Sequence, residues 1–236
     1  MPPDSLVRSA TSCGVPVPGV SGPEARVKPR WRGVLHQYAF FGSLGSGTLL
    51  VLLAASTRAS VAVVVYSASV SALLGVSALY HRVTWTAAAR RRMRRLDHAM
   101  ILVLIAGTYT PVGLLVLHGL LGVVVLGVVW GGAVAGIVLE LAWRGAPRWL
   151  GGVVYLALGW VAVVAMPQLF ERLGAVGGSL IVAGGLAYSA GAAVYGLRRP
   201  DPAPAVFGYH EVFHLLVIVG IVAHFLAISL FAVPLG

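Results

Sequence analysis

Two histidines at the start of the last apolar run, His210 and His214, have the type and the spacing that metal binding requires. Side chains four positions apart in a helix lie on one face, with their Cβ atoms about 5–6 Å apart. Both imidazoles can therefore hold the same metal ion. Together with Glu211 they also match the HExxH pattern of zinc proteases, in which the glutamate is the general base.

The composition indicates a polytopic membrane protein. Of the 236 residues, 58% are hydrophobic and 10% are charged, whereas a soluble domain has about 25% charged residues. The net charge of +10 would suit nucleic acid, but the basic residues lie in short loops between apolar runs. There they suit anionic lipid headgroups, so we expect lipid partners and no nucleic acid. The single cysteine, Cys13, excludes an internal disulfide and a cysteine-based metal site.

Seven apolar segments are each long enough to cross a bilayer, which takes about 20 helical residues. They follow a basic, proline-containing tail over residues 1–32, which we expect to be flexible, and they make residues 33–236 one membrane domain. A sustained alternation of apolar and polar residues, which would favour strands, is missing. The sequence therefore predicts an all-α bundle of seven transmembrane helices over residues 34–56, 60–81, 97–117, 119–139, 149–167, 174–196 and 210–233.

The distribution of basic residues predicts the orientation of this bundle. Fifteen lysines and arginines lie in the tail and the even-numbered loops, and two lie in the other loops. Because cytoplasmic loops carry the excess of Lys and Arg, we expect the N-terminus in the cytoplasm and the C-terminus outside. In that orientation, four polar residues from three segments fall within a turn or two of the cytoplasmic membrane face: His81, Asp97, His210 and His214.

A third imidazole at this level, that of His81, completes a candidate metal site. Three neutral imidazoles leave one tetrahedral position for water, as in catalytic zinc sites. Zinc brings the pKa of such a water to about 7, and Asp97 is the candidate general base for it. Ser77 lies one turn deeper than His81 on the same helical face, where its hydroxyl can hold an imidazole or a carboxylate in place. Zinc is the ion expected for three imidazoles.

Other polar residues in the apolar runs have structural interpretations. His98 and His118 are expected to be interface residues near helix ends. His224 lies about 15 Å along its helix beyond the histidine pair, and we expect it to be a buried polar contact. The run from Thr108 to Pro111 predicts a kink whose freed carbonyls accept hydrogen bonds from hydroxyls. His36, near the cytoplasmic end of the first segment, is an interface residue, a substitute ligand or a group that supports the ligands.

Four motifs, taken together, carry a family resemblance. They are Ser77-x-x-x-His81, Leu96-Asp97-His98-Ala99, the run from Ile105 to Pro111, and His210-Glu211-x-Phe213-His214 with His224 after it. From about residue 33 to its end the chain resembles the hemolysin III family, the bacterial branch of the progestin and adipoQ receptor family. It departs from that family in the first segment, where Leu35-His36-Gln37 stands in place of a frequent Thr-His-Gly.

The resemblance implies seven helices with an inside N-terminus and a zinc ion held by His81, His210 and His214. It also implies that Asp97 contacts the zinc water, that Ser77 supports the site, and that the chain is kin to a membrane hydrolase superfamily that includes alkaline ceramidases. On this basis we expect a zinc-dependent hydrolase of a lipid amide or ester in the cell membrane, with Asp97 taking the proton.

Three alternatives remain beside the hydrolase hypothesis. The first is a seven-helix sensor or receptor-like protein with a structural zinc. The second is a membrane-lytic protein, and the third is an intramembrane metalloprotease that uses Glu211 as its base. Against the protease, no acidic residue in a later helix completes a set of two histidines and a carboxylate. Glu211 is then a candidate for proton transfer or the first-turn acid of its helix.

Overall fold

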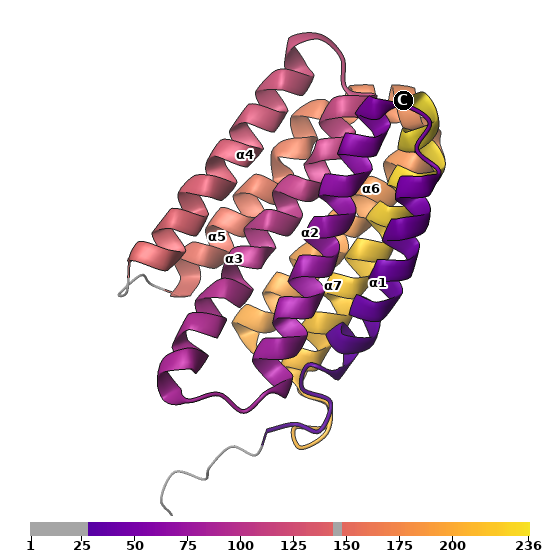
Figure 1. The fold of residues 1–236 in the computed structure, drawn as a ribbon. Coiled ribbons are helices and arrows are strands. Elements are labelled where there is room, and N and C mark those ends of the chain that lie inside the picture. Colours follow the sequence, from indigo (N-terminus) through magenta and orange to yellow (C-terminus); the bar gives the residue numbers. More distant parts are fainter. Residues whose placement is uncertain (1–27, 144–147) are drawn as a thin grey trace, which may run out of the picture.

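The computed structural model describes residues 28–143 and 148–236, which form a bundle of helices lying side by side (Figure 1). Within these residues no strand occurs, and an isolated β-bridge joins Ala203 and Phe207 in a loop. The prediction of an all-α fold is confirmed, while most of the predicted tail lies outside the described residues. The helices are α1 (Val34–Leu52), α2 (Thr57–Arg82), α3 (Ala87–Pro111), α4 (Gly119–Ala142), α5 (Arg148–Gly159), α6 (Met166–Leu197) and α7 (Tyr209–Ala227).

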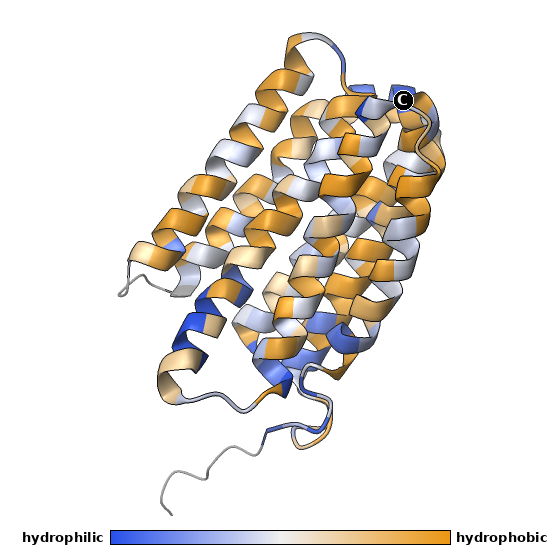
Figure 2. Ribbon diagram, viewed as in Figure 1, coloured by the Kyte–Doolittle hydropathy of each residue, from blue (hydrophilic) through white to orange (hydrophobic). Residues whose placement is uncertain are grey.

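Four short π- or 3₁₀-helical pieces extend α3, α5 and α7. They are η1 (Val112–Val116), η2 (Trp160–Ala165), η3 (Ile228–Ala232) and η4 (Val233–Leu235). With them, five helical stretches of the described chain are long and apolar enough to cross a membrane. Helix α1 is not among them, because His36 and Gln37 lower its mean hydropathy. Hydrophilic residues gather at the end of the bundle where α2 ends and α7 begins (Figure 2). This distribution is that of a multi-pass membrane protein.

One of the five stretches, Trp149–Leu197, has 49 residues, far more than one crossing needs. Gly174 interrupts it with φ 68° and ψ −179°. The indole N–H of Trp160 donates to Ser189 Oγ at 3.0 Å, and the ring of Phe170 lies against the Gly178 backbone. In each of these two contacts, one residue precedes Gly174 and the other follows it by about the same number of positions. The two halves of the stretch therefore lie side by side, and the chain reverses at Gly174. Residues 167–173, predicted to be the break between two segments, are helical, and the single glycine that follows them makes the turn.

Replacing Gly174 by alanine is expected to destabilise the bundle by about 1–3 kcal/mol, because its backbone conformation is essentially restricted to glycine. A Cβ there would meet nothing within 4 Å, so the cost arises from the backbone alone. The measurement is the midpoint of unfolding by SDS in mixed micelles. Gly127→Ala in α4 is the control, since that position also has open space and an ordinary helical backbone. Equal midpoints for the two variants would contradict the prediction.

Two predicted boundaries differ from the structure because capping residues, rather than hydropathy, set helix starts. Helix α3 begins at Ala87, ten residues before the predicted start, because Thr86 accepts a hydrogen bond from the Ala89 N–H at 3.3 Å. The run of arginines at 90–95 is therefore helical rather than a loop. Likewise, Ser56 caps α2 by accepting from the Ala59 N–H at 3.0 Å, so the predicted segment 34–56 extends too far.

The run from Thr108 to Pro111 makes hydroxyl-to-carbonyl hydrogen bonds of the predicted kind, and the kink itself stays a prediction. The Thr108 hydroxyl donates to the carbonyl of Leu104 at 2.8 Å, and the Thr110 hydroxyl donates to that of Ala106 at 2.9 Å. Proline has no N–H with which to continue the helical ladder. After Pro111 the chain passes into the π-helical turn η1.

Helices α2 and α7 share a hydrophobic core, and this core positions the candidate site. Tyr66 and Leu74 of α2 are buried in one cluster with Val217 of α7 and Ile228 of η3. Helix α1 packs against both α2 and α7. The three helices therefore have a fixed relation at the end where the hydrophilic residues gather (Figure 1).

Candidate metal centre

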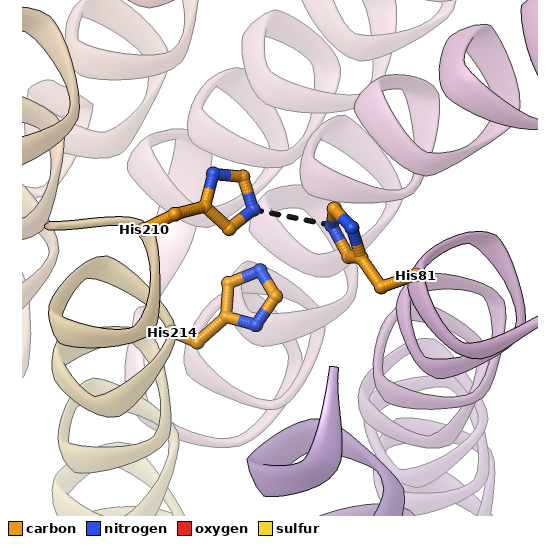
Figure 3. A group of neighbouring side chains, drawn as sticks. All are labelled: His81, His210 and His214. Carbon is orange, nitrogen blue, oxygen red and sulfur yellow. Dashed lines mark hydrogen bonds between the residues drawn. The ribbon is translucent and has the colours of Figure 1, made fainter. Parts of the chain in front are cut away.

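Three imidazoles from α2 and α7 meet at this end of the bundle. Figure 3 shows the side chains of His81, His210 and His214 converging between the two helices. One ligand nitrogen of each lies within 4.8 Å of those of the other two, and Nε2 of His81 is 3.1 Å from Nε2 of His210. His81 and His214 are buried, and His210 is half-buried. The prediction that these three side chains lie together is confirmed, and their binding of a metal stays a prediction.

The three imidazoles fit the requirements of a zinc ion. Zinc–nitrogen bonds of 2.0–2.1 Å in a tetrahedral arrangement put ligand nitrogens about 3.3 Å apart. The nitrogens here approach that separation, and the ring centroids are 4.6 to 5.0 Å from one another. Neutral imidazoles that are largely withdrawn from water, with two nitrogens in contact, offer lone pairs that suit a cation and not an anion.

The backbone in front of α1 holds His81 in place. Gly33 has φ 81°, and a Cβ added there would lie 2.6 Å from the Cβ of His81. Only glycine adopts this conformation readily and lets the backbone approach so closely. The backbone at the start of α1 is therefore packed directly on the Cβ atom of His81.

Glu211 holds the start of α7, which carries the other two imidazoles. The side chain of Glu211 is fully buried, its Oε2 accepts the Gly208 N–H at 2.8 Å, and its Oε1 accepts the Arg32 Nε–H at 2.5 Å. The carboxylate thereby caps the helix and forms an ion pair with the segment that precedes α1. Because both of its oxygens have structural partners, the geometry favours the first-turn acid over the protease base.

Two backbone hydrogen bonds join the same two segments. The N–H groups of Arg30 and Trp31 donate to the carbonyls of Ala205 and Val206, each at 3.1 Å. The stretch before α1 and the loop before α7 thus run together past the end of the bundle (Figure 1). They tie the first and last helices together beside the histidines.

Ser77 and Asp97 lie together on facing helices. Ser77 is buried in α2, and its hydroxyl lies near the half-buried carboxylate of Asp97 in α3 and interacts with it. Asp97 does not belong to the group of neighbouring ligand atoms that the three imidazoles form in the described chain. Ser77 and Asp97 therefore lie together, with Ser77 one helical turn from His81. Their roles in catalysis stay predictions.

The remaining histidines divide as follows. The predicted buried contact of His224 is confirmed, since its Nε2 lies 3.0 Å from the carbonyl of Ile181. His98 lies 3.3 Å from Glu140 through its Nδ1, and His118 is exposed at the opposite end of the bundle. His36 is buried beside the three-histidine cluster, with its ring stacked on that of His214.

Two residues beside the histidine cluster could not be placed there from the sequence. Arg32 was counted only as a basic residue of the tail, and Tyr195 of α6 was not considered, although its ring centroid is 5.5 Å from that of His210. The pattern of an arginine before an apolar segment signals topology and does not show its partner. An aromatic residue near a helix end is equally unspecific, so neither signal would have placed these residues.

Comparison with known proteins agrees with the motifs. Residues 25–225 match the sequence model of the family described as Haemolysin-III related. The chain is similar to Hemolysin-3 of Bacillus cereus, with 34% identity over 179 residues that cover 76% of this chain and 78% of that protein. It is also similar to the Hemolysin-3 homolog of Bacillus subtilis (strain 168), with 30% identity over 203 residues, 85% of this chain and 92% of that one. The chain therefore belongs to the haemolysin III family and is a multi-pass membrane protein.

Proposed function

We propose that this protein is a zinc-dependent membrane hydrolase that cleaves an amide or ester bond of a lipid. The observation that carries the proposal is the convergence of three imidazoles within 4.8 Å, from helices far apart in the sequence, at one end of a membrane bundle. Ionisable or metal-binding side chains in such segments are costly and are retained for function. A site at this depth, near the boundary of acyl chains and headgroups, suits a lipid substrate.

The topology that we propose has seven spans, with the N-terminus in the cytoplasm. The reversal at Gly174 divides the longest apolar stretch into two crossings, and α1 adds one to the remaining four. The excess of lysine and arginine on the side of the tail supports a cytoplasmic N-terminus. The histidines and the basic loops then lie at the inner leaflet, where anionic headgroups are the proposed lipid partners.

In the proposed reaction, His81, His210 and His214 hold the zinc. Zinc in such a set polarises a carbonyl oxygen and supplies a hydroxide nucleophile near neutral pH. Asp97 is proposed to take the proton from the attacking water, with the Ser77 hydroxyl holding its carboxylate. Glu211 and Arg32 fix the first turn of α7, and thereby the two imidazoles that it carries.

Replacing Asp97 by asparagine is expected to leave the zinc content unchanged and to lower turnover about 10²–10⁴-fold, the usual contribution of a general base. The measurement is hydrolysis of a panel of labelled ceramides and lipid esters by the protein purified in detergent. Glu171→Gln, which removes an exposed carboxylate from the turn at the opposite end, is the control. Full turnover by Asp97→Asn, or no turnover of any panel member by zinc-loaded wild type, would contradict the hydrolase.

A sensor with a structural zinc is the second candidate. It is favoured by the way in which the imidazoles join α2 to α7 and by the position of Asp97 outside their group. For that function, removal of zinc should lower the melting temperature greatly, and Asp97→Asn should change neither stability nor any activity. The similar proteins are named for haemolysis, and dye release from liposomes by purified protein tests that activity here.

A further inference from the structure

His36 is a buried imidazole of α1 with no role in the site as described so far. It is 2% exposed, and its ring lies on that of His214 with the centroids 3.8 Å apart and the planes 7° from parallel. Neither of its ring nitrogens has a hydrogen-bond partner of good geometry among the described residues. Even an approach to the His214 backbone would satisfy one of the two nitrogens and leave the other unpaired.

The parallel stack excludes His36 from the ligand set. A metal ion lies in the plane of an imidazole that binds it, so an ion in the plane of His214 lies well outside the plane of His36. His36 is accordingly absent from the group of ligand atoms that lie within 4.8 Å of one another. The His36 ring lies one ring thickness from the His214 ring. At that distance from a metal site, side chains contact the ligands of the ion or a bound molecule, and not the ion itself.

Buried imidazoles nearly always have hydrogen-bond partners, because leaving a polar group unpaired in an apolar interior is costly. The His36 ring covers that of His214, so the nearest group that can supply a partner is whatever the three histidines bind. In an apolar bundle such a partner must be a small polar molecule or the polar part of a larger one. A carbonyl, hydroxyl or amide group of a lipid has the required donors or acceptors.

We infer that His36 is a substrate-binding residue, which hydrogen-bonds the carbonyl or hydroxyl of the lipid that enters the three-histidine centre and orients it for attack. This inference rests on the proposed function, because it requires an ion at the centre. It assigns two tasks to one ring: the face supports His214, and the edge binds the substrate.

The experiment separates the two tasks by using variants that keep one of them. His36→Phe keeps an aromatic ring against His214 and removes the nitrogens. His36→Gln and His36→Asn place an amide nitrogen near the positions of Nε2 and Nδ1. Each purified variant is assayed for zinc affinity, by competition with a chromophoric chelator, and for the affinity of acetohydroxamate, a small metal-binding amide. His118→Phe removes an exposed imidazole at the opposite end and is the control.

We expect His36→Phe to bind zinc within about threefold of wild type and acetohydroxamate about five- to tenfold more weakly, the size of one lost hydrogen bond. Either His36→Gln or His36→Asn should restore the acetohydroxamate affinity. Unchanged acetohydroxamate affinity in His36→Phe would overturn the inference and leave the hydrolase standing. A loss of zinc affinity beyond tenfold in His36→Phe would overturn it by making His36 a ligand. Wild type that binds no zinc would overturn both proposals.

Discussion

Replacing His214 by alanine is expected to lower the affinity for zinc at least about 100-fold, more than the loss of a residue that only supports a ligand costs. His214 is 2% exposed and lies against both other imidazoles, with its ring centroid 5.0 Å from that of His81 and 4.6 Å from that of His210. Its removal leaves two nitrogens, which hold zinc poorly. The measurement is metal content by mass spectrometry together with a chelator competition that gives the dissociation constant.

The same substitution should remove the stabilisation that zinc gives. A ligand present at 1,000 times its dissociation constant stabilises the folded state by about 4 kcal/mol, so the melting temperature of wild type should rise with added zinc and that of His214→Ala should not. His98→Ala is the control, since this imidazole lies at the same end of the bundle and pairs with Glu140. Unchanged metal content in both His81→Ala and His214→Ala would show that the site assignment is wrong.

The second large effect is expected at Glu211, whose replacement by alanine should lower the free energy of unfolding by about 3 kcal/mol. The substitution leaves Arg32, 22% exposed, without its partner and uncaps α7, and breaking a buried ion pair costs about 3–5 kcal/mol. Because the first turn of α7 carries two of the imidazoles, the zinc affinity should fall as well. Equilibrium unfolding in mixed micelles and the chelator competition measure the two effects.

A second contact of a glutamate with a basic side chain, among the described residues, provides a matched control for Glu211. Glu140 and His98 are 3.3 Å apart, but their side chains are 24% and 35% exposed, so Glu140→Ala should cost less than about 1 kcal/mol. If Glu211→Ala instead unfolds like wild type, keeps its zinc and loses all hydrolysis, then Glu211 is a general base and the HExxH interpretation is right. The stability measurement thus decides between two roles that the sequence pattern leaves open.

The sequence predicted that the three imidazoles lie at the same depth in the membrane, because two strong constraints act on the helices that carry them. Apolar runs of bilayer length fix which residues lie within the membrane, and successive crossings put the end of α2 and the start of α7 at the same face. Depth alone was then enough to bring His81 close to the histidine pair of α7. The four-residue spacing fixed the face shared by His210 and His214.

The sequence did not predict features that depend on rotation about helix axes or on caps. The stacking of His36 on His214 requires knowing which face of α1 turns toward α7, and an apolar segment with small residues on all sides carries little of that information. The pairing of Arg32 with Glu211 joins residues 179 positions apart through a loop path that hydropathy does not encode. The start of α3 at Ala87 depends on Thr86 as a cap, which a search for apolar runs passes over.

The order in which the ligands are synthesised limits when the centre forms. His81 precedes His210 by 129 positions, and α7 is the last of the described helices to leave the ribosome. Until that helix has inserted, the imidazole on α2 has no partners, and a nascent chain that stops before residue 209 has nothing with which to complete the site. With zinc bound as proposed, the metal content of a preparation would report finished biogenesis, and partly inserted molecules would be recognised by lacking it.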